Sequence, residues 1–375
     1  MFALHEPLKH KPKCRVQLHI HLDGAIRHET IWELLRKKKL PLPGSGSLED
    51  LKNALKVQEP QDLGFFLHGF TIFMPAFAGD LEAIERISHE FVEDQAKESV
   101  AYCETRFCPH LFLPDIAHQP DYLTSEVNGT AEGNSGSVTI DDVLKAVLKG
   151  LRRGEEEFGT KVRVILCCIR GLPHLSWEIL RLCDEYRDKG VVGIDIAGNE
   201  GSQGGENAGM QNAVDIAVFQ AAKEKGIHRT VHAGEAGPAK GVQEAVENFA
   251  AERIGHGYRV LEDENIYQKC LRENIHFEVC PHSSYMTGAI KNLTTASKRH
   301  PVLRFAEDEA SFSISTDDPT ITFTTLPDEY RLLSSWGFTE AHFTRANFEA
   351  AKHCFLPEVE KQILLQVLRD TYGAV

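Results

Sequence analysis

The sequence lacks the long apolar runs that membrane proteins need. None of its 375 residues belongs to an uninterrupted apolar stretch of the roughly 20 residues that cross a bilayer. The first residues, MFALHEPLKHKPKC, contain no apolar core of signal-peptide length. We therefore expect a cytoplasmic protein with no membrane partner.

Positive charge is also scarce. The 41 lysines and arginines are outnumbered by 55 aspartates and glutamates, which leaves a net charge of −14. A chain of this charge is poorly suited to a nucleic-acid backbone or an anionic membrane, whereas small neutral or cationic ligands remain suitable partners. No pattern identifies a protein partner, and we expect a monomer.

Cysteine pairs with the spacing of a metal or redox site are absent. The nine cysteines include no C-x-x-C motif, which disfavours zinc fingers, thioredoxin-like sites and zinc deaminases of the cytidine type. Several lie in apolar runs such as residues 165–169, where cysteine behaves as a small hydrophobe. Any zinc site must therefore use histidine and carboxylate ligands.

The order of apolar segments favours an α/β fold. Helical spacing dominates residues 25–98, and short apolar strand candidates alternate with helices over the rest of the chain. The strand candidates are 16–24, 100–107, 162–169, 191–196, 229–232, 253–257, 276–280 and 312–315. Because no glycine-rich phosphate turn follows the first strand, a doubly wound sheet is disfavoured. We predict a single domain, 1–375, that forms a (β/α)8 TIM barrel with a helical insertion, 25–98, after strand 1.

The first strand carries an H-x-H motif. Strand alternation places His19, His21 and, if the extended run continues, Asp23 on one face. Two such imidazoles are half of a metal site, although an isolated H-x-H is often a pair of partly solvated histidines.

Polar residues also follow the later strands. The active site of such a barrel lies at the carboxyl ends of its strands, where His232, His256 and Asp317 follow the fifth, sixth and eighth candidates. His19, His21, His232 and Asp317 together suit one zinc ion that would activate a water molecule. His232 alone could equally be a hydrogen-bonded core residue.

Three further residues could take part in proton transfer or substrate binding. Glu235 could move protons above the metal or cap the next helix. His256 could orient water or face solvent, and Asp318 could contact substrate or cap a turn.

Six motifs occur in an order that resembles the animal-type adenosine deaminases of the metal-dependent amidohydrolase superfamily. They are LHIHLDGAI at 18–26, IDIAGNE at 194–200, IHRTVHAGE at 227–235, RIGHGY at 253–258, HFEVCPHSSYMTGA at 276–289 and STDDP at 315–319. The resemblance implies hydrolytic deamination of adenosine and 2′-deoxyadenosine to inosine and 2′-deoxyinosine plus ammonia, a reaction of purine salvage. The implied partner is a small purine nucleoside.

The resemblance also implies roles for single residues. One Zn²⁺ per subunit would be bound by His19, His21, His232 and Asp317, while Glu235 would protonate purine N1 and His256 would deprotonate the attacking water. Implied substrate contacts are His21, Asp23 at a ribose hydroxyl, Asp318 at N7, the Gly198 N–H at N3, and an apolar wall of Leu63, Phe66, Leu67 and Phe70. Spacing alone would make those four apolar residues ordinary helix core.

Two residues depart from the family pattern, and three rival functions need comparison. Asn199 stands where an acid is expected, and His282 stands where a tryptophan often follows Cys-Pro. Deaminases of adenine or of N6-modified AMP look similar, but they tend to carry Glu or Asn at the position of Asp23. A barrel that has lost catalysis and only binds a nucleoside or a protein is disfavoured, because Glu235 and His256 are both present. A binuclear amidohydrolase would need a bridging lysine after the fourth strand, and there is none.

Overall fold

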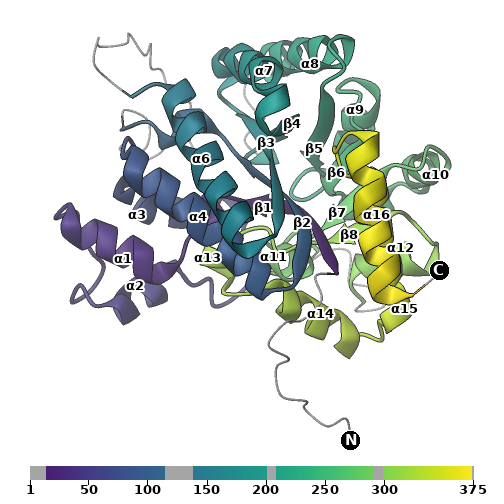
Figure 1. Cartoon of the computed structure of the whole chain (residues 1–375). Helices are drawn as coiled ribbons and strands as arrows, with labels where there is room; N and C mark the ends of the chain where they lie inside the picture. The colour runs from purple at the N-terminus through teal and green to yellow at the C-terminus, as the bar shows by residue number, and fades with distance from the viewer. Residues whose placement is uncertain (1–13, 115–137, 201–207, 291–298, 374–375) are drawn as a thin grey trace, which may run out of the picture.

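Eight parallel strands form the centre of the computed structural model, which describes residues 14–114, 138–200, 208–290 and 299–373. The strands pair in chain order from β1 to β8 (Figure 1). They are β1 (Arg15–His21), β2 (Val100–Phe107), β3 (Lys161–Ile169), β4 (Val191–Ala197), β5 (His228–Ala233), β6 (Arg253–His256), β7 (His276–Val279) and β8 (Phe312–Ile314). The predicted (β/α)8 barrel and its eight strands are confirmed.

The barrel closes where β1 meets the segment that follows β8. Ile20 pairs in parallel with Asp317. The His21 N–H donates to the Asp317 carbonyl at 2.9 Å, and the Asp317 N–H donates to the His19 carbonyl at 3.2 Å. The seam of the barrel is therefore made by residues that the sequence also marks as candidate metal ligands.

Helices surround the strands, and four of them form the insertion between β1 and β2. The insertion contains α1 (His28–Lys37), α2 (Leu48–Leu55), α3 (Leu63–Phe73) and α4 (Leu81–Lys97). The barrel helices that follow are α6 (Ile140–Phe158), α7 (Ser176–Glu185), α8 (Ala208–Glu224), α9 (Ala239–Glu247), α10 (Glu264–Arg272), α11 (Pro281–Met286) and α12 (Pro301–Glu307). Side-chain caps begin three of the insertion helices, since Ser47, Asp62 and Asp80 each accept a first-turn N–H.

Close packing joins the insertion to the barrel. A Cβ at Gly150 of α6 would lie 2.2 Å from the Glu85 carbonyl of α4, and one at Gly154 would lie 2.5 Å from Val92. Both positions need glycine because the two helices approach too closely for a side chain. No helix of the described residues is long and apolar enough to cross a membrane.

Four helices after β8 were not predicted from the sequence. They are α13 (Pro319–Thr322), α14 (Leu326–Ser335), α15 (Glu340–His353) and α16 (Glu358–Tyr372). The outward side chains Val16 and Leu18 of β1 are buried in one cluster with Ala350 of α15 and with Leu364 and Leu368 of α16. These last two helices therefore cover the outer face of the first strand, which would otherwise expose apolar side chains.

A buried acid in α14 gives a testable pH dependence. Glu329 is 1% exposed, and its Oε2 accepts the His282 N–H at 3.0 Å. Burial raises the pKa of Glu329 from 4.5 to about 8. The unfolded chain ionises this group at lower pH than the folded protein, so the folded state loses stability as the pH rises from 4.5 to 8.

The variant Glu329→Gln should remove this loss. We expect its free energy of unfolding to match the wild type below about pH 4.5 and to exceed it by several kcal/mol, up to about 5 kcal/mol, near pH 8. Urea unfolding at a series of pH values measures the difference. Glu340→Gln, at the exposed start of α15, serves as the control with no pH-dependent effect. A Glu329→Gln difference that is constant with pH would contradict the prediction.

Candidate active site

The carboxyl ends of the strands bring imidazoles and carboxylates together. β1 supplies His19 and His21, β5 supplies His232, and β6 supplies His256. Asp317 follows β8. All except His21 are buried, and 15% of the His21 side chain is exposed. The sequence-predicted metal ligands thus meet at one end of the barrel.

The side-chain atoms of this group converge. The Nε2 atoms of His19 and His21 lie 3.2 and 3.4 Å from Asp317 Oδ1. His21 Nε2 also lies 3.2 Å from His232 Nε2. His19 Nε2 is buried and makes no hydrogen bond of good geometry within the described part of the chain. The ligand atoms that lie within 4.8 Å of one another form two sets, one from His19, His232, His256 and Asp317 and one from His21, Asp317 and Asp318, so the larger set contains His256 where the sequence predicted His21. Three imidazole nitrogens and a carboxylate oxygen from this cluster could bind a divalent metal ion that favours nitrogen ligands.

Two residues of the site have a left-handed backbone. The φ angles of His256 and Asp317 are 62° and 67°. A residue with a Cβ pays roughly 1–2 kcal/mol for this conformation, so packing around the site must impose it. Such strain is common where a fold holds functional side chains in place.

A buried arginine lies beneath the imidazoles. Arg106 donates to Asp195 at 2.8 Å and to Glu278 at 2.7 Å, and all three side chains are inaccessible to solvent. Glu278 lies 2.7 Å from His19 Nδ1, and Asp195 lies 2.9 Å from His232 Nδ1. A carboxylate at Nδ1 favours the proton on that nitrogen and leaves the Nε2 lone pair facing the site.

Opposite charges keep both carboxylates ionised. Burial acts to raise the pKa of Asp195, but His232 and Arg106 outweigh it and lower that pKa. Burial likewise opposes ionisation of Glu278, whose pKa Arg106 and Arg253 hold well below its usual value. Arg106, Asp195 and Glu278 therefore form a fixed set of buried charges beneath the imidazoles, which we call the charged floor.

A small cavity of about 70 Å³ opens above this group. Its polar lining comprises His21, Asp23, Gly198, His232, Glu235, His256, Asp317 and Asp318, and its apolar wall includes Leu63, Phe66, Leu67 and Phe70 of α3. The structure thus brings every residue predicted to contact substrate to one cavity. Their individual roles stay predictions.

Three acids of the cavity have raised pKa values. Burial raises the pKa of Asp23 to about 7. Burial and then the charge of Asp317 raise the pKa of Asp318 well above its usual value, and burial raises that of Glu235 although His256 opposes the shift. A raised pKa eases protonation of each of these carboxyls, and a protonated carboxyl can donate a hydrogen bond to an acceptor atom of a ligand.

Two side chains lie against the Glu235 carboxyl. The Thr287 hydroxyl donates to Oε1 at 2.9 Å, and His256 Nε2 lies 3.5 Å from Oε2. His256 Nε2 is also 3.8 Å from Asp317 Oδ2. A histidine between an acid and a candidate metal ligand is well placed to handle a proton of a water molecule.

Asp23 reaches the cavity by a route that strand alternation did not anticipate. The extended run ends at His21, and Asp23 begins a short 3-10 helix, Asp23–Ala25. The Cβ that Gly24 lacks would clash with Asp318 at 1.8 Å, so the chain must turn at this point with a glycine. Asn199 and His282, which depart from the family pattern, are not among the residues that line the cavity.

Sequence reasoning missed several residues of the site. Leu111, Ile169 and Ala197 line the cavity, and the charged set beneath it was not proposed. A signal for the charged set was present, because Arg106, Asp195 and Glu278 are charged residues within short strands of a predicted barrel. Charged side chains at inward strand positions need buried partners.

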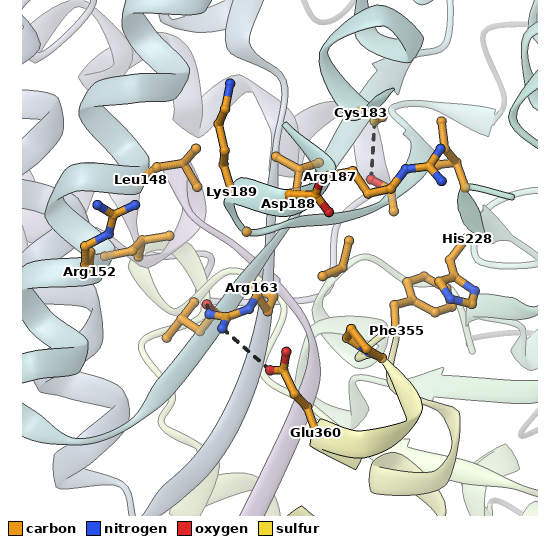
Figure 2. Close-up of a pocket in the computed structure, with 18 of the residues that line it drawn as sticks. Leu148, Arg152, Arg163, Cys183, Arg187, Asp188, Lys189, His228, Phe355 and Glu360 are labelled. Atoms are coloured by element: carbon orange, nitrogen blue, oxygen red, sulfur yellow. Dashed lines mark hydrogen bonds and ion pairs between the residues drawn. The ribbon is translucent and has the colours of Figure 1, made fainter. Parts of the chain in front are cut away.

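A larger cavity lies at the opposite end of β3, β4 and β5, with a volume of about 510 Å³ (Figure 2). Among its charged groups, Arg163 lies 2.9 Å from Glu155 and 3.8 Å from Glu360. His228 stacks on Phe355 with ring centroids 4.7 Å apart. The smaller cavity is therefore the candidate active site, because the converging imidazoles and carboxylates line it and not the larger one.

Comparison with known sequences gives one consistent result. The family model described as adenosine deaminase matches residues 12–371. An adenosine deaminase of Danio rerio is 45% identical and aligns with 98% of this chain and 97% of its own length. One of Mus musculus is also 45% identical, over 98% of this chain and 99% of its own length.

Solved structures share the architecture. An N6-mAMP deaminase of Arabidopsis superposes with a TM-score of 0.76 at 25% identity, over 95% of this chain and 98% of its own. An adenine deaminase of Arthrobacter aurescens gives a TM-score of 0.79 at 23% identity, over 97% and 100% of the two chains. The second likeness supports the fold alone.

The charged floor gives a prediction for metal affinity. Glu278→Gln removes the carboxylate at His19 Nδ1, and we expect it to weaken Zn²⁺ binding about 10- to 100-fold. It should also lower the free energy of unfolding by about 3–5 kcal/mol, because Arg106 and Arg253 each lose a partner. Competition with a chromophoric chelator measures the affinity.

Glu104→Gln is the matched control. Glu104 is equally buried and pairs with Arg253 at 2.6 Å, but it contacts no imidazole of the site. We expect a similar loss of stability and an unchanged Zn²⁺ affinity. Equal loss of affinity in both variants would show that Glu278 has no specific effect on the ligands.

Proposed function

The chain belongs to the adenosine deaminase family, and we propose that it is a zinc hydrolase that converts adenosine and 2′-deoxyadenosine to inosine and 2′-deoxyinosine with release of ammonia. Its role would be the salvage of purine nucleosides in the cytoplasm. One observation carries the proposal: the imidazoles of His19, His21 and His232 and the Asp317 carboxylate converge beneath a cavity that Glu235 and His256 also line.

His19, His21, His232 and Asp317 would bind one Zn²⁺ ion. Three nitrogens and one oxygen are a normal ligand set for catalytic zinc, and the carboxylates at two of the Nδ1 atoms leave Nε2 free to coordinate. When bound, the ion supplies Lewis acidity that makes a water molecule nucleophilic at neutral pH.

Glu235 and His256 would carry the proton transfers. Glu235 would donate a proton to purine N1, which makes C6 a better electrophile. His256 would hold the attacking water and accept its proton. The two side chains lie 3.5 Å apart, which supports proton transfers at neighbouring positions, purine N1 and the water that attacks C6.

The remaining contacts would orient the nucleoside. Asp318, with its raised pKa, would donate to N7, and the Gly198 N–H would donate to N3. Asp23 would accept from or donate to a ribose hydroxyl. Leu63, Phe66, Leu67 and Phe70 would cover the base and exclude water from the cavity.

Nucleotides fit this cavity poorly. None of the described residues that line it is an arginine or a lysine, and Asp23 lies where the sugar is expected. A 5′-phosphate would therefore enter without a cation to pair with it. This distinguishes the proposal from deamination of N6-modified AMP, the activity in the name of one structural relative.

The metal and the acid can be tested together by following the loss of the adenosine absorbance band. We expect a chelator to abolish turnover and Zn²⁺ to restore it. Glu235→Gln should lower kcat by about 10²- to 10⁴-fold, because the amide cannot protonate N1. The zinc content of this variant should equal that of the wild type. If metal-replete wild-type protein does not deaminate adenosine, the proposed function fails and a binding scaffold takes its place.

Substrate choice gives a second test. The ratio kcat/KM should be higher for adenosine than for AMP by on the order of 100-fold, because the phosphate finds no cation in the cavity. Asp23→Asn should reduce turnover of adenosine and should lower the preference for adenosine over AMP, measured as the quotient of their kcat/KM values. Initial rates with adenosine, adenine and AMP measure both effects. A preference of the wild type for AMP or adenine would contradict the substrate assignment.

A further inference from the structure

The turn between β5 and α9 carries Glu235, and groups from other parts of the chain hold its backbone. The Arg170 guanidinium donates to the His232 carbonyl at 2.6 Å. The Arg259 N–H donates to the Gly234 carbonyl at 2.9 Å, and its guanidinium donates to that of Ala236. These contacts satisfy the carbonyl groups of His232, Gly234 and Ala236 and leave the N–H groups of the turn to be accounted for.

One side chain accepts three of those N–H groups. Glu200 Oε1 accepts from Gly234 at 2.9 Å, while Oε2 accepts from Glu235 at 3.0 Å and from Gly237 at 2.6 Å. All three donor residues are buried. Hydrogen bonds to an ionised acceptor are stronger than neutral ones, and three on one carboxylate fix a short turn firmly.

The turn is shaped to accept this carboxylate. A Cβ at Gly237 would lie 3.2 Å from both Glu200 Cδ and Oε2, so a side chain there would press against the carboxyl group. Gly234 has a φ of +71°, which a residue with a Cβ rarely adopts. Both glycines thus let the N–H groups point towards one acceptor.

We propose that Glu200 is a positioning residue for the deamination reaction, because its carboxylate fixes the turn that carries the proposed acid Glu235. Glu200 itself does not touch the substrate. The Thr287 hydroxyl holds the Glu235 carboxyl at 2.9 Å, whereas Glu200 holds the Glu235 backbone. The inference rests on the proposed function, since it assigns Glu235 to purine N1.

A second effect of Glu200 acts in the same direction. Burial raises the pKa of Glu235, and the negative charges of Asp317 and, to a smaller extent, Glu200 add to that rise against the opposing effects of His256 and His232. A carboxyl that must donate a proton benefits from a nearby negative charge. The same side chain thus supports both the place and the protonated form of Glu235.

The test compares Glu200→Gln with the wild type. The amide presents an NH₂ group to donors that need an acceptor, so the turn should shift. We expect kcat for adenosine to fall about 10- to 100-fold, KM to change by less than about threefold, and the zinc content to stay the same. Hydrogen exchange of residues 233–237 should become faster.

An inhibitor that lacks N1 shows whether Glu200→Gln only misplaces Glu235 or also damages the substrate cavity. In 1-deazaadenosine a C–H group replaces N1, so the compound cannot accept a proton from Glu235. Its inhibition constant should be the same for Glu200→Gln and the wild type. Glu244→Gln is the matched control, because Glu244 borders the same surface depression as Glu200 but does not bond the turn. It should leave every readout unchanged.

The outcomes are distinct. Wild-type kcat in Glu200→Gln, or an inhibition constant that rises as much as kcat falls, would overturn the inference and leave the proposed function intact. A wild-type protein that does not deaminate adenosine would overturn both. If Glu200→Gln does not fold, Gly237→Ala displaces the carboxylate by a different route and should give the same pattern in weaker form.

Discussion

The pairing of Arg106 with two buried carboxylates is the constraint on which the site depends. An arginine without solvent contact at the centre of a barrel is stable only if its charge is matched, and Asp195 and Glu278 match it at 2.8 and 2.7 Å. Those carboxylates in turn contact His232 and His19. The orientation of the imidazoles is therefore set by an electrostatic requirement of the core.

Much of the fold could be predicted because its signal is local. Strand candidates were apolar, short and separated by helical spacing, and all eight were confirmed within a few residues. The helices α13 to α16 after β8 were missed. α15 and α16 are amphipathic helices whose apolar faces pack on the outside of β1, more than 300 positions earlier in the chain. No window of sequence contains both partners of that contact.

The residues of the candidate site also fall into two groups, those with a local signal in the sequence and those whose contacts only the fold reveals. Strand ends identified His19, His21, His232 and Asp317, because a parallel barrel gathers those ends wherever they lie in the sequence. Asp23 reached the cavity through a 3-10 turn and not through strand alternation. The part of Glu200 could not be predicted either. Its three hydrogen bonds connect residues 34 to 37 positions apart, and only the folded turn shows that their N–H groups converge.

The seam of the barrel has a consequence for how the protein responds to metal. Asp317 pairs through its backbone with β1 and offers its side chain to the same imidazoles that β1 carries. A cation shared by these side chains would join the first and last strands across a ring of eight. Binding of the metal and closure of the barrel would then be thermodynamically linked. A higher concentration of free metal would stabilise the closed, folded barrel.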